Sequence, residues 1–495
     1  MKTRREFLAE GASAAAGLML TSAASGYSTP SNRRPNVLYV FDDEHRFQSM
    51  PGEPYSDPVV APNIDAFRKA NFSMERCISN YPLCSPYRGI LMTGLWPFQN
   101  GIIRNWIELG TEFKSIGQAF DDAGYRTAYV GKWHLSGPGH DRAFIPPGPH
   151  RQGFQDWHVW GAVNKHMNYS FTFNPDTGEK IQPMGYQATL MTDQAVKIIH
   201  DEHGDKPWMM IVSWHPPHFP VDDAPEADEA FFADKKVALR PNVKTGQGTR
   251  EVASTESITR FHQGYYAHIR AIDREFGRLL KALDDTGQAE NTIVIFTSDH
   301  GEMAGSHGRM YKQVPFEESV RVPFYVRYPG VTPKQASSDA LFASIDIYPT
   351  VCGLAGVPAP SQLKGKDFSA TLRGKSTPES EVVFLMNVGP PAAHHEHAAA
   401  AEHHEHAAAN GGGFPPPHFR GLRSRTHTYA VASDGRWILF NHLDDPYQMH
   451  NLIDDPKQKP LMDHFDALIL EWLKDANDPF DYSTALNRRS GAPAA

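Results

Sequence analysis

The stretch NVLYVFDD, residues 36–43, is a largely apolar run that ends in two acids. A continuous apolar run of this length is typical of a strand that is buried on both faces of a sheet. A second run, TIVIFT at residues 292–297, is followed by SDHG at residues 298–301. Both patterns place acids directly after a buried strand, and in open α/β sheets ligands bind at that carboxyl edge.

Strands and helices alternate along most of the chain. Further strands are predicted at residues 127–130, 208–213 and 322–327, and helices at 64–70, 88–92, 116–123, 190–200, 258–284 and 345–354. This alternation predicts an α/β fold in which a large, mostly parallel sheet is sandwiched by helices. After about residue 375 the pattern changes to short strands at 381–386, 429–433 and 437–441 and a helix at 461–474. We expect these to form a small C-terminal antiparallel sheet with a helix.

Three parts of the chain are distinguished by composition. Residues 1–26 have a basic start with Arg4-Arg5, a short apolar run and small residues, which is typical of an export signal of the twin-arginine type. An ordinary secretory signal is the alternative, and either predicts a periplasmic or secreted protein. We expect a catalytic domain at residues 35–375 and a C-terminal subdomain at 376–485.

The C-terminal subdomain carries a His-rich insertion at residues 390–419. It contains HHEHAAAAE and then HHEHAAANG, a repeat that starts at His394 and His403. Clustered histidines can bind metal, so a metal-buffering role or a place at the rim of the substrate site stands beside the simpler interpretation of a solvated loop.

Composition excludes several classes of protein. The formal net charge of -9 argues against nucleic acid as a partner, because that role needs a basic face. No stretch is long and apolar enough to predict a transmembrane segment. The three cysteines are too few for a disulfide framework, and Cys77 and Cys352 are expected to be small buried side chains.

The third cysteine lies in the segment LCSPYRGILMTG, residues 83–94. This segment resembles the signature of the sulfatase family, Cys-x-Pro-x-Arg followed by Thr-Gly. The resemblance implies that a formylglycine-generating enzyme oxidises Cys84 to formylglycine, whose hydrated aldehyde attacks sulfur and later expels sulfate by collapsing back to the aldehyde. Arg88 would hold the diol oxygens. Tyr87 departs from the small residue that many members carry there.

The acids that follow the two apolar strands resemble the family's cation site. The resemblance implies that Asp42, Asp43, Asp299 and His300 hold a divalent cation beside the modified side chain of Cys84. Carboxylate oxygens favour Ca²⁺. His300 supplies a nitrogen, which leaves Mg²⁺, Mn²⁺ or Zn²⁺ open.

Four more residues match family motifs that supply cationic and proton-transferring groups. Lys132 and His134 lie in GKWHL, His218 lies in HPPHFP, and Lys312 follows the SDHGE segment. The resemblance implies that His218, helped by Lys312, protonates the leaving alcohol. It implies that His134 takes a proton from the second hydroxyl, with Lys132 paired to that hydroxyl or to a sulfate oxygen. Such donors stabilise the charge that spreads over the sulfuryl oxygens.

Taken together, the resemblance implies an alkaline-phosphatase-like fold and a sulfuric ester hydrolase. The substrate is expected to be a sulfated carbohydrate or a small sulfate ester, and export favours an extracellular sulfated glycan. Trp106, Trp160 and Trp214 could stack on sugar rings or could pack in the core. A phosphonate or phosphate monoester hydrolase of the same superfamily would share the same residues. A non-catalytic protein that binds sulfoglycans or metal would instead keep Cys84 unmodified.

Overall fold

The computed structural model describes residues 33–487, except 53–54, 138–143, 162–164, 169–170, 202–205, 247–251, 377, 379 and 389–416. The predicted export signal and residues 390–416 of the predicted insertion therefore lie outside the described residues. Among the residues that are described, no helix combines the length and the apolar character that a membrane crossing requires.

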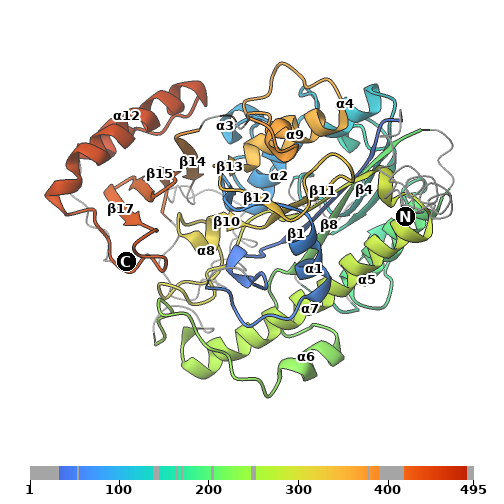
Figure 1. Ribbon diagram of the computed structural model, residues 1–495, viewed down its shortest axis with the longest axis horizontal. Helices are drawn as coiled ribbons and strands as arrows, with labels where there is room; N and C mark the ends of the chain where they lie inside the picture. The colour runs from blue at the N-terminus through green and yellow to red at the C-terminus, as the bar shows by residue number, and fades with distance from the viewer. Residues whose placement is uncertain are drawn as a thin grey trace, which may run out of the picture. The chain divides into compact units, whose positions relative to one another are not determined.

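A ten-stranded sheet runs through the centre of the main body (Figure 1). Its five middle strands are parallel, as predicted for the sheet, although the strand at residues 156–160 was not predicted, and the strands outside them include antiparallel neighbours. In spatial order the strands are β12 (Ala336–Ser338), β2 (Phe72–Met74), β11 (Phe324–Arg327), β9 (Thr292–Ser298), β1 (Asn36–Asp43), β8 (Trp208–Pro217), β4 (Arg126–Lys132), β5 (Asp156–Trp160), β6 (Thr172–Phe173) and β7 (Lys180–Ile181).

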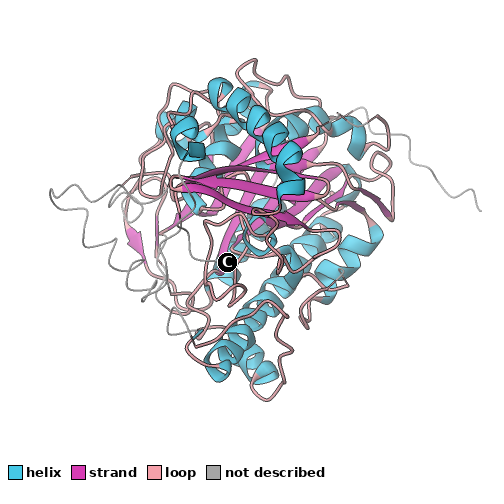
Figure 2. Ribbon diagram, turned by 90° about the vertical axis from the view of Figure 1, so that its left-hand side faces the viewer, coloured by secondary structure: helices cyan, strands magenta, loops and turns pink. Residues whose placement is uncertain are grey.

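Helices cover both faces of this sheet, and Figure 2 shows the strands between the two helical layers. One layer contains α1 (Pro62–Ala70), α5 (Gln187–His200), α6 (Glu226–Phe232) and α7 (Thr255–Asp285). The other contains α2 (Cys84–Thr93), α4 (Ile116–Asp122), α9 (Ser344–Ala355) and α10 (Ser369–Leu372), with the short α3 (Pro97–Asn100) after α2.

The central strand β1 shows why both layers are needed. Its side chains alternate, so that Leu38 and Val40 pack with the α5 and α7 layer, while Val37, Tyr39 and Phe41 pack with the α2 and α9 layer. All eight residues of the strand are buried. A strand that is buried on both faces has no polar side to alternate, which explains its continuous apolar run.

Two differences from the predicted element boundaries involve proline. The strand predicted at residues 322–327 is divided between β10 (Arg321–Val322) and β11, because Pro323 between them has no N–H to donate to a ladder. β10 joins β3 (Cys77–Ile78) and β13 (Phe342–Ala343) in a separate small sheet. Helix α2 begins at Cys84 rather than Arg88, since Pro86 is tolerated in a first helical turn, where N–H groups lack helical partners.

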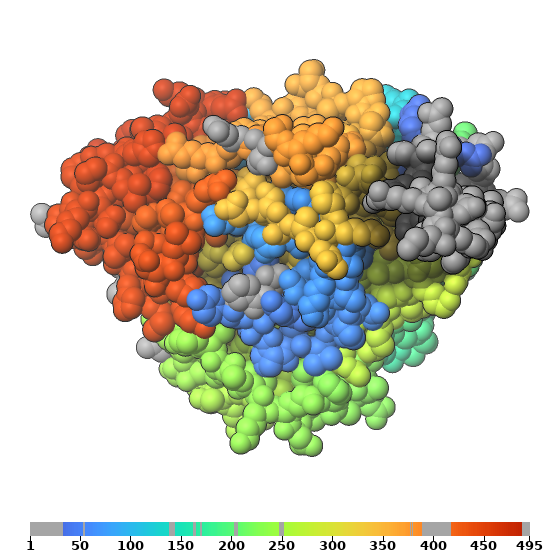
Figure 3. Space-filling view, in the orientation of Figure 1, coloured from blue at the N-terminus to red at the C-terminus, as the bar shows by residue number. Residues whose placement is uncertain are grey.

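A four-stranded antiparallel sheet follows in the C-terminal part. It consists of β14 (Val382–Asn387), β15 (Phe419–Ser424), β16 (His427–Ala432) and β17 (Gly435–Asn441), with helices α12 (Lys459–Asp475) and α13 (Tyr482–Asn487). Its apolar side chains share one core with residues near α8 (Glu317–Val320). In Figure 3 the C-terminal part, coloured orange to red, lies directly against the main body. A buried ion pair between Arg423 and Glu317, 2.5 Å between Nε and Oε1, joins β15 to α8.

Candidate active site

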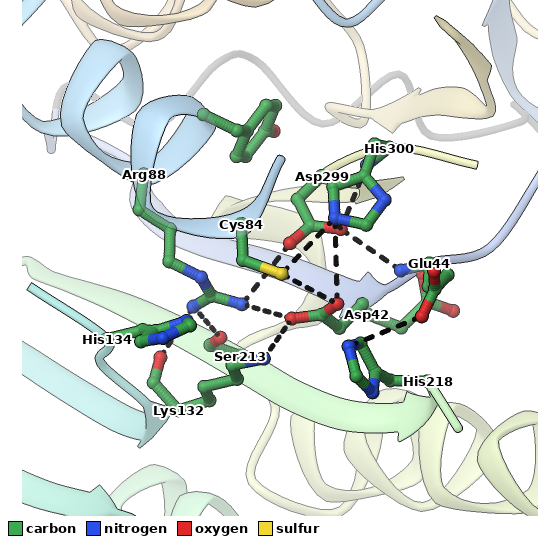
Figure 4. A network of polar contacts seen from close by, with 12 residues as sticks. Asp42, Glu44, Cys84, Arg88, Lys132, His134, Ser213, His218, Asp299 and His300 are labelled. Atoms are coloured by element: carbon green, nitrogen blue, oxygen red, sulfur yellow. Dashed lines mark hydrogen bonds and ion pairs between the residues drawn. The ribbon is translucent and has the colours of Figure 1, made fainter. Parts of the chain in front are cut away.

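Four parallel strands end at the same edge of the sheet, and each brings polar residues there. Asp43 ends β1, and Asp299 and His300 follow β9. Lys132 ends β4, and His218 follows β8 directly. The carboxyl edge that the sequence predicted to bind a ligand is therefore lined by acids and bases from separate strands, as Figure 4 shows.

Cys84 lies at the centre of this edge, as the first residue of α2. Its Sγ is 3.5 Å from Oδ1 of Asp43, 3.3 Å from Nε2 of His300 and 3.4 Å from Nζ of Lys312. The side chain is 1% exposed. Burial raises the pKa of the Cys84 thiol, with the charge of Asp43 acting in the same direction. An unmodified Cys84 would therefore be a protonated and weak nucleophile.

Arg88 lies one helical turn after Cys84 and joins the acids to the scaffold. Its Nη2 donates to Oδ2 of Asp43 at 3.0 Å and lies 3.5 Å from Oδ2 of Asp299. Its Nη1 donates to the Lys132 carbonyl oxygen at 2.6 Å and to the Ser213 hydroxyl at 2.7 Å. The two ends of one planar guanidinium thus serve different partners in a fixed geometry.

Asp43 is the most strongly held acid of the site. Its Oδ2 pairs with Nζ of Lys132 at 2.8 Å as well as with Arg88. Burial alone would raise the pKa of Asp43, but Lys132, His218, Lys312 and Arg88 together hold it well below its usual value. Asp43 is therefore ionised.

Asp299 is a second buried acid beside Asp43. Its Oδ1 accepts the backbone N–H of Glu44 at 3.0 Å and of His300 at 2.9 Å, which fixes the carboxylate. Burial and the negative charge of Asp43 raise the pKa of Asp299 to about 8. Two buried acids that repel one another are the arrangement that a bound cation relieves.

The residues present fit a divalent cation. Donor atoms of Asp43, Cys84, Asp299 and His300 all lie within 4.8 Å of one another. Asp42 is outside this group, because its Oδ2 pairs with Nδ1 of His45 at 2.7 Å. Its Oδ1, however, is buried without a hydrogen-bond partner within the part of the chain that the structure describes. Such an orphaned carboxylate oxygen suits a hard cation.

His218 and Lys312 meet at a residue that the sequence analysis did not select. Glu44 lies between them, with Oε2 3.3 Å from Nε2 of His218 and Oε1 3.3 Å from Nζ of Lys312. Burial raises the pKa of Glu44 to about 8, against the effect of Lys312. The signal for Glu44 was its position directly after the two acids that end β1.

His134 occupies the opposite side of the site. Figure 4 shows its ring beside Arg88 and Lys132, and the Trp106 ring packs edge-on against it at 4.7 Å between ring centroids. Burial and the charges of Lys132 and Arg88 lower the pKa of His134 well below its usual value. His134 is therefore a neutral imidazole, which can accept a proton.

Tyr87, the departure from the family motif, points away from this chemistry. Its hydroxyl lies 3.1 Å from that of Tyr39, and its ring packs 5.9 Å from that of Phe41. Both partners belong to β1, so Tyr87 fills the core between α2 and the sheet. The large side chain at this position therefore leaves the face that carries Cys84 and Arg88 unaltered.

Comparison with known proteins agrees with this geometry. A model of the family described as Sulfatase matches residues 35–357, which is more than half of the chain. The chain belongs to the sulfatase family. It is therefore a sulfuric ester hydrolase with the alkaline-phosphatase-like fold that the sequence motifs implied.

Relatives of this sulfatase match it over most of their length. It is 32% identical over 450 residues to an ulvan-active sulfatase of Formosa agariphila, covering 90% of this chain and 82% of that one. It is 29% identical to an endo-4-O-sulfatase of Bacteroides thetaiotaomicron, covering 94% and 98%. A solved structure from work on glycosaminoglycan metabolism in Bacteroides thetaiotaomicron superposes with a TM-score of 0.79 at 28% identity, covering 91% and 98%.

Proposed function

We propose that this sulfatase hydrolyses a sulfate ester on an extracellular sulfated carbohydrate, with Cys84 converted to formylglycine and a divalent cation beside it. The observation that carries the proposal is the position of Cys84 Sγ, within 3.5 Å of Asp43, His300 and Lys312 at once. The names of the two relatives, which refer to ulvan and to a 4-O-sulfate, support a polysaccharide as the substrate.

The hydrated aldehyde would supply a nucleophile that can later expel sulfate by collapsing to the aldehyde. The cation would supply Lewis acidity toward a sulfate oxygen. We propose Ca²⁺, because carboxylates dominate the donor set of Asp42, Asp43 and Asp299. His300 adds a nitrogen donor, so Mg²⁺ and Mn²⁺ are tested in parallel with Ca²⁺.

The chain's own cations would hold the sulfate group. Arg88, Lys132 and Lys312 carry three positive charges, and Asp43, Glu44 and Asp299 offer three acids when all are ionised. Burial raises the pKa of Asp299 and of Glu44 to about 8, so near neutral pH without a cation the positive charges exceed the negative ones and attract a sulfate monoanion. A divalent cation would favour the ionised form of both acids and would itself attract the sulfate group.

His218 is placed to move a proton at Nε2. Its Nδ1–H donates to the Phe219 carbonyl oxygen at 2.7 Å, which turns Nε2 toward Glu44 and the site. We propose that His218, when both ring nitrogens are protonated, gives the Nε2 proton to the leaving alcohol oxygen, and that Glu44 is a positioning residue that fixes the ring. His134, on the opposite side, is proposed to take the proton that accompanies sulfate release.

Trp106 is the proposed contact for a sugar ring. Trp160 is 6% exposed and Trp214 is fully buried, so both pack in the core. Trp106 is half-buried and lies against His134 at the site. A Trp106→Ala variant should raise KM for a glycan substrate much more than KM for a small aryl sulfate.

We also propose an export signal and a division of the rest of the chain into two parts. Residues 1–26 would export the folded enzyme to the periplasm or beyond it. Residues 35–375 would form the catalytic domain and 376–485 the subdomain that borders the substrate. A twin-lysine replacement of Arg4 and Arg5 tests the export route, since export that continues unchanged would exclude a twin-arginine signal.

Two measurements test the proposed chemistry directly. Mass spectrometry of the tryptic peptide 77–88 from protein made in its native host should find an aldehyde at Cys84 and an unchanged thiol at Cys77. Release of sulfate from a panel of sulfated polysaccharides should then identify the substrate. A far higher kcat/KM for an aryl phosphonate than for the matching aryl sulfate would instead favour the phosphonate hydrolase alternative.

A further inference from the structure

A second group of metal-ligand side chains lies behind the active site. His166, Asp223 and His268 come from three separate segments: the stretch before α5, the loop after β8, and the middle of α7. One donor atom of each lies within 4.8 Å of the others. Both histidines are fully buried, and the Asp223 side chain is 21% exposed. The group therefore has a closed interior and an opening on one side.

The hydrogen bonds of His166 fix which ring nitrogen is available. Its Nε2 lies 2.7 Å from the carbonyl oxygen of His218, which can only accept, so Nε2 carries the proton and donates. In this tautomer Nδ1 is the nitrogen that carries the lone pair. Nδ1 is buried, and no hydrogen bond reaches it from the described residues. An imidazole with one N–H fixed to a carbonyl and the other nitrogen open is typical of a metal ligand.

Asp223 presents one oxygen to the same point. Its Oδ2 accepts the backbone N–H of His166 at 2.6 Å, which leaves Oδ1 for another partner. Oδ1 makes no hydrogen bond within the described part of the chain.

The distance between Asp223 and His268 suits two ligands of one ion better than a hydrogen bond. His268 Nε2 lies 3.5 Å from Asp223 Oδ1. A hydrogen bond between nitrogen and oxygen is shorter, at about 2.7–3.2 Å. Two atoms that are each about 2.1 Å from a tetrahedral Zn²⁺ are separated by roughly 3.4 Å. His268 Nδ1 lies 2.8 Å from the Tyr186 hydroxyl, which can accept its proton and leave Nε2 free to coordinate.

A neighbouring polar side chain also lacks a partner. The backbone N–H of Gln187 donates to the His166 carbonyl oxygen at 2.8 Å, so Gln187 lies next to the group. Its side chain is fully buried close to the His166 ring, and neither carboxamide atom reaches a partner in good hydrogen-bond geometry among the residues that the structure describes. Unpaired buried polar atoms are uncommon in native proteins, and a bound ion or its coordinated water would satisfy this side chain.

We propose that His166, Asp223 and His268 form a second divalent-cation site, separate from the catalytic one, that binds Zn²⁺ with a fourth position left to water or to Gln187. Two imidazoles and one carboxylate suit zinc, whereas the acid-rich catalytic site suits a harder cation. The bound ion would fix His166, whose Nε2–H holds the backbone of His218. The ion would thus help to hold His218, the proposed proton donor, in place.

A network of charged side chains without metal is the competing interpretation. In that case a protonated His268 would pair with the Asp223 carboxylate, and His166 Nδ1 would remain unpaired. The two interpretations differ in whether zinc is found at this point. The difference does not depend on sulfatase activity, so the second site and the proposed function can fail separately.

The experiment uses the full chain without an affinity tag, stripped with a chelator and reloaded with Ca²⁺ and then Zn²⁺. Crystals measured on both sides of the zinc absorption edge should give an anomalous difference peak bonded to His166, Asp223 and His268. This readout reports position, so zinc bound by the His-rich segment does not interfere. An empty site in crystals that bind zinc elsewhere would overturn the proposal.

Matched variants give a second readout in solution. His268→Gln removes a ligand, and His262→Gln is the control, because His262 is also a buried histidine of α7 but bonds to Tyr266 and Ala304 instead. Relative to His262→Gln, His268→Gln should bind one fewer Zn²⁺ per chain and lose the rise in Tm that Zn²⁺ produces. Equal zinc binding by the two would contradict the proposal. Asp223→Asn, at a partly exposed position, replaces His268→Gln if that variant does not fold.

Discussion

Replacement of Arg88 by lysine should lower kcat even though the positive charge is kept. The guanidinium uses Nη1 for the Lys132 carbonyl oxygen and the Ser213 hydroxyl, and Nη2 for Asp43. The single ammonium group of a lysine cannot bond to the Lys132 carbonyl oxygen, the Ser213 hydroxyl and Asp43 at the same time. The variant therefore loses at least one hydrogen bond to a charged group, which contributes about 1.5–3 kcal/mol. Since 1.36 kcal/mol corresponds to a factor of ten in rate, we expect kcat to fall roughly ten- to one-hundred-and-fifty-fold.

The assay must separate this effect from incomplete maturation, because Arg88 lies in the motif that the modifying enzyme is expected to read. Hydrolysis of an aryl sulfate is measured with excess Ca²⁺, and kcat is divided by the formylglycine content found by mass spectrometry.

Ser213→Ala weakens the hydrogen bonding of Arg88 without a change inside the modification motif. It removes one acceptor of Arg88 and leaves the Lys132 carbonyl in place, so a decrease of about five-fold, or roughly 1 kcal/mol, is expected.

A matched control comes from a second buried arginine. Arg151 is 5% exposed and donates to the carbonyl oxygens of Ile145 and Pro175, none of which belongs to the active site. Arg151→Lys should reduce stability and leave kcat unchanged. The reasoning would be refuted if Arg88→Lys, corrected for formylglycine, had the kcat of the wild type, or if Arg151→Lys lost as much activity as Arg88→Lys.

Three further results are expected. Arg423→Ala leaves buried Glu317 with only the more distant Arg321, at 3.8 Å, as an ion-pair partner among the described residues, and should lower the free energy of unfolding by about 3 kcal/mol in urea titrations. Burial would raise the pKa of Glu317, but Arg423 holds it below its usual value. The wild type should therefore lose this stabilisation as pH falls below the unfolded pKa toward the folded one, and the variant should not. Gly131 has φ of 118°, and a Cβ there would lie 2.0 Å from the Ser213 carbonyl oxygen, so Gly131→Ala should lower unfolding free energy by about 3 kcal/mol. Chelation should abolish sulfate release, and added Ca²⁺ should restore it; activity that survives complete chelation would contradict the proposed cation.

The sequence predicted the parallel centre of the sheet because its strands are uniformly apolar. Strand β1 and strand β9 are buried throughout, so each reads as an unbroken hydrophobic run that ends in acids. The outer strands were missed for the converse reason. β6 and β7 have two residues each, half-buried or exposed, and such short elements carry no periodic pattern. Their pairing is decided by neighbouring strands rather than by their own residues.

The same distinction applies to the site. Cys84, Arg88, Lys132 and Lys312 were selected because they fall in motifs, and the structure brings all four within one buried network. Glu44 was missed because an acid that directly follows two other acids carries no separate sequence signal of a functional role. Its importance arises only when the loop with Lys312 and the turn with His218 close over it, and those contacts join segments far apart in the sequence.

Asp42 and Asp43 show where a motif stops being informative about geometry. Neighbouring residues of a strand point to opposite faces, so two adjacent acids do not present their carboxylates in the same direction on a regular strand. The pairing of β1 with β8 shifts register between Phe41 and Asp43, at the point where the acids occur. Asp43 turns toward Arg88 and Lys132, and Asp42 turns toward His45. Asp43 therefore faces the reacting centre, whereas Asp42 has only its Oδ1, unpaired among the described residues, to offer to a cation. The backbone geometry at the end of β1 decides which carboxylate oxygen can face an ion, and the Asp-Asp sequence alone does not.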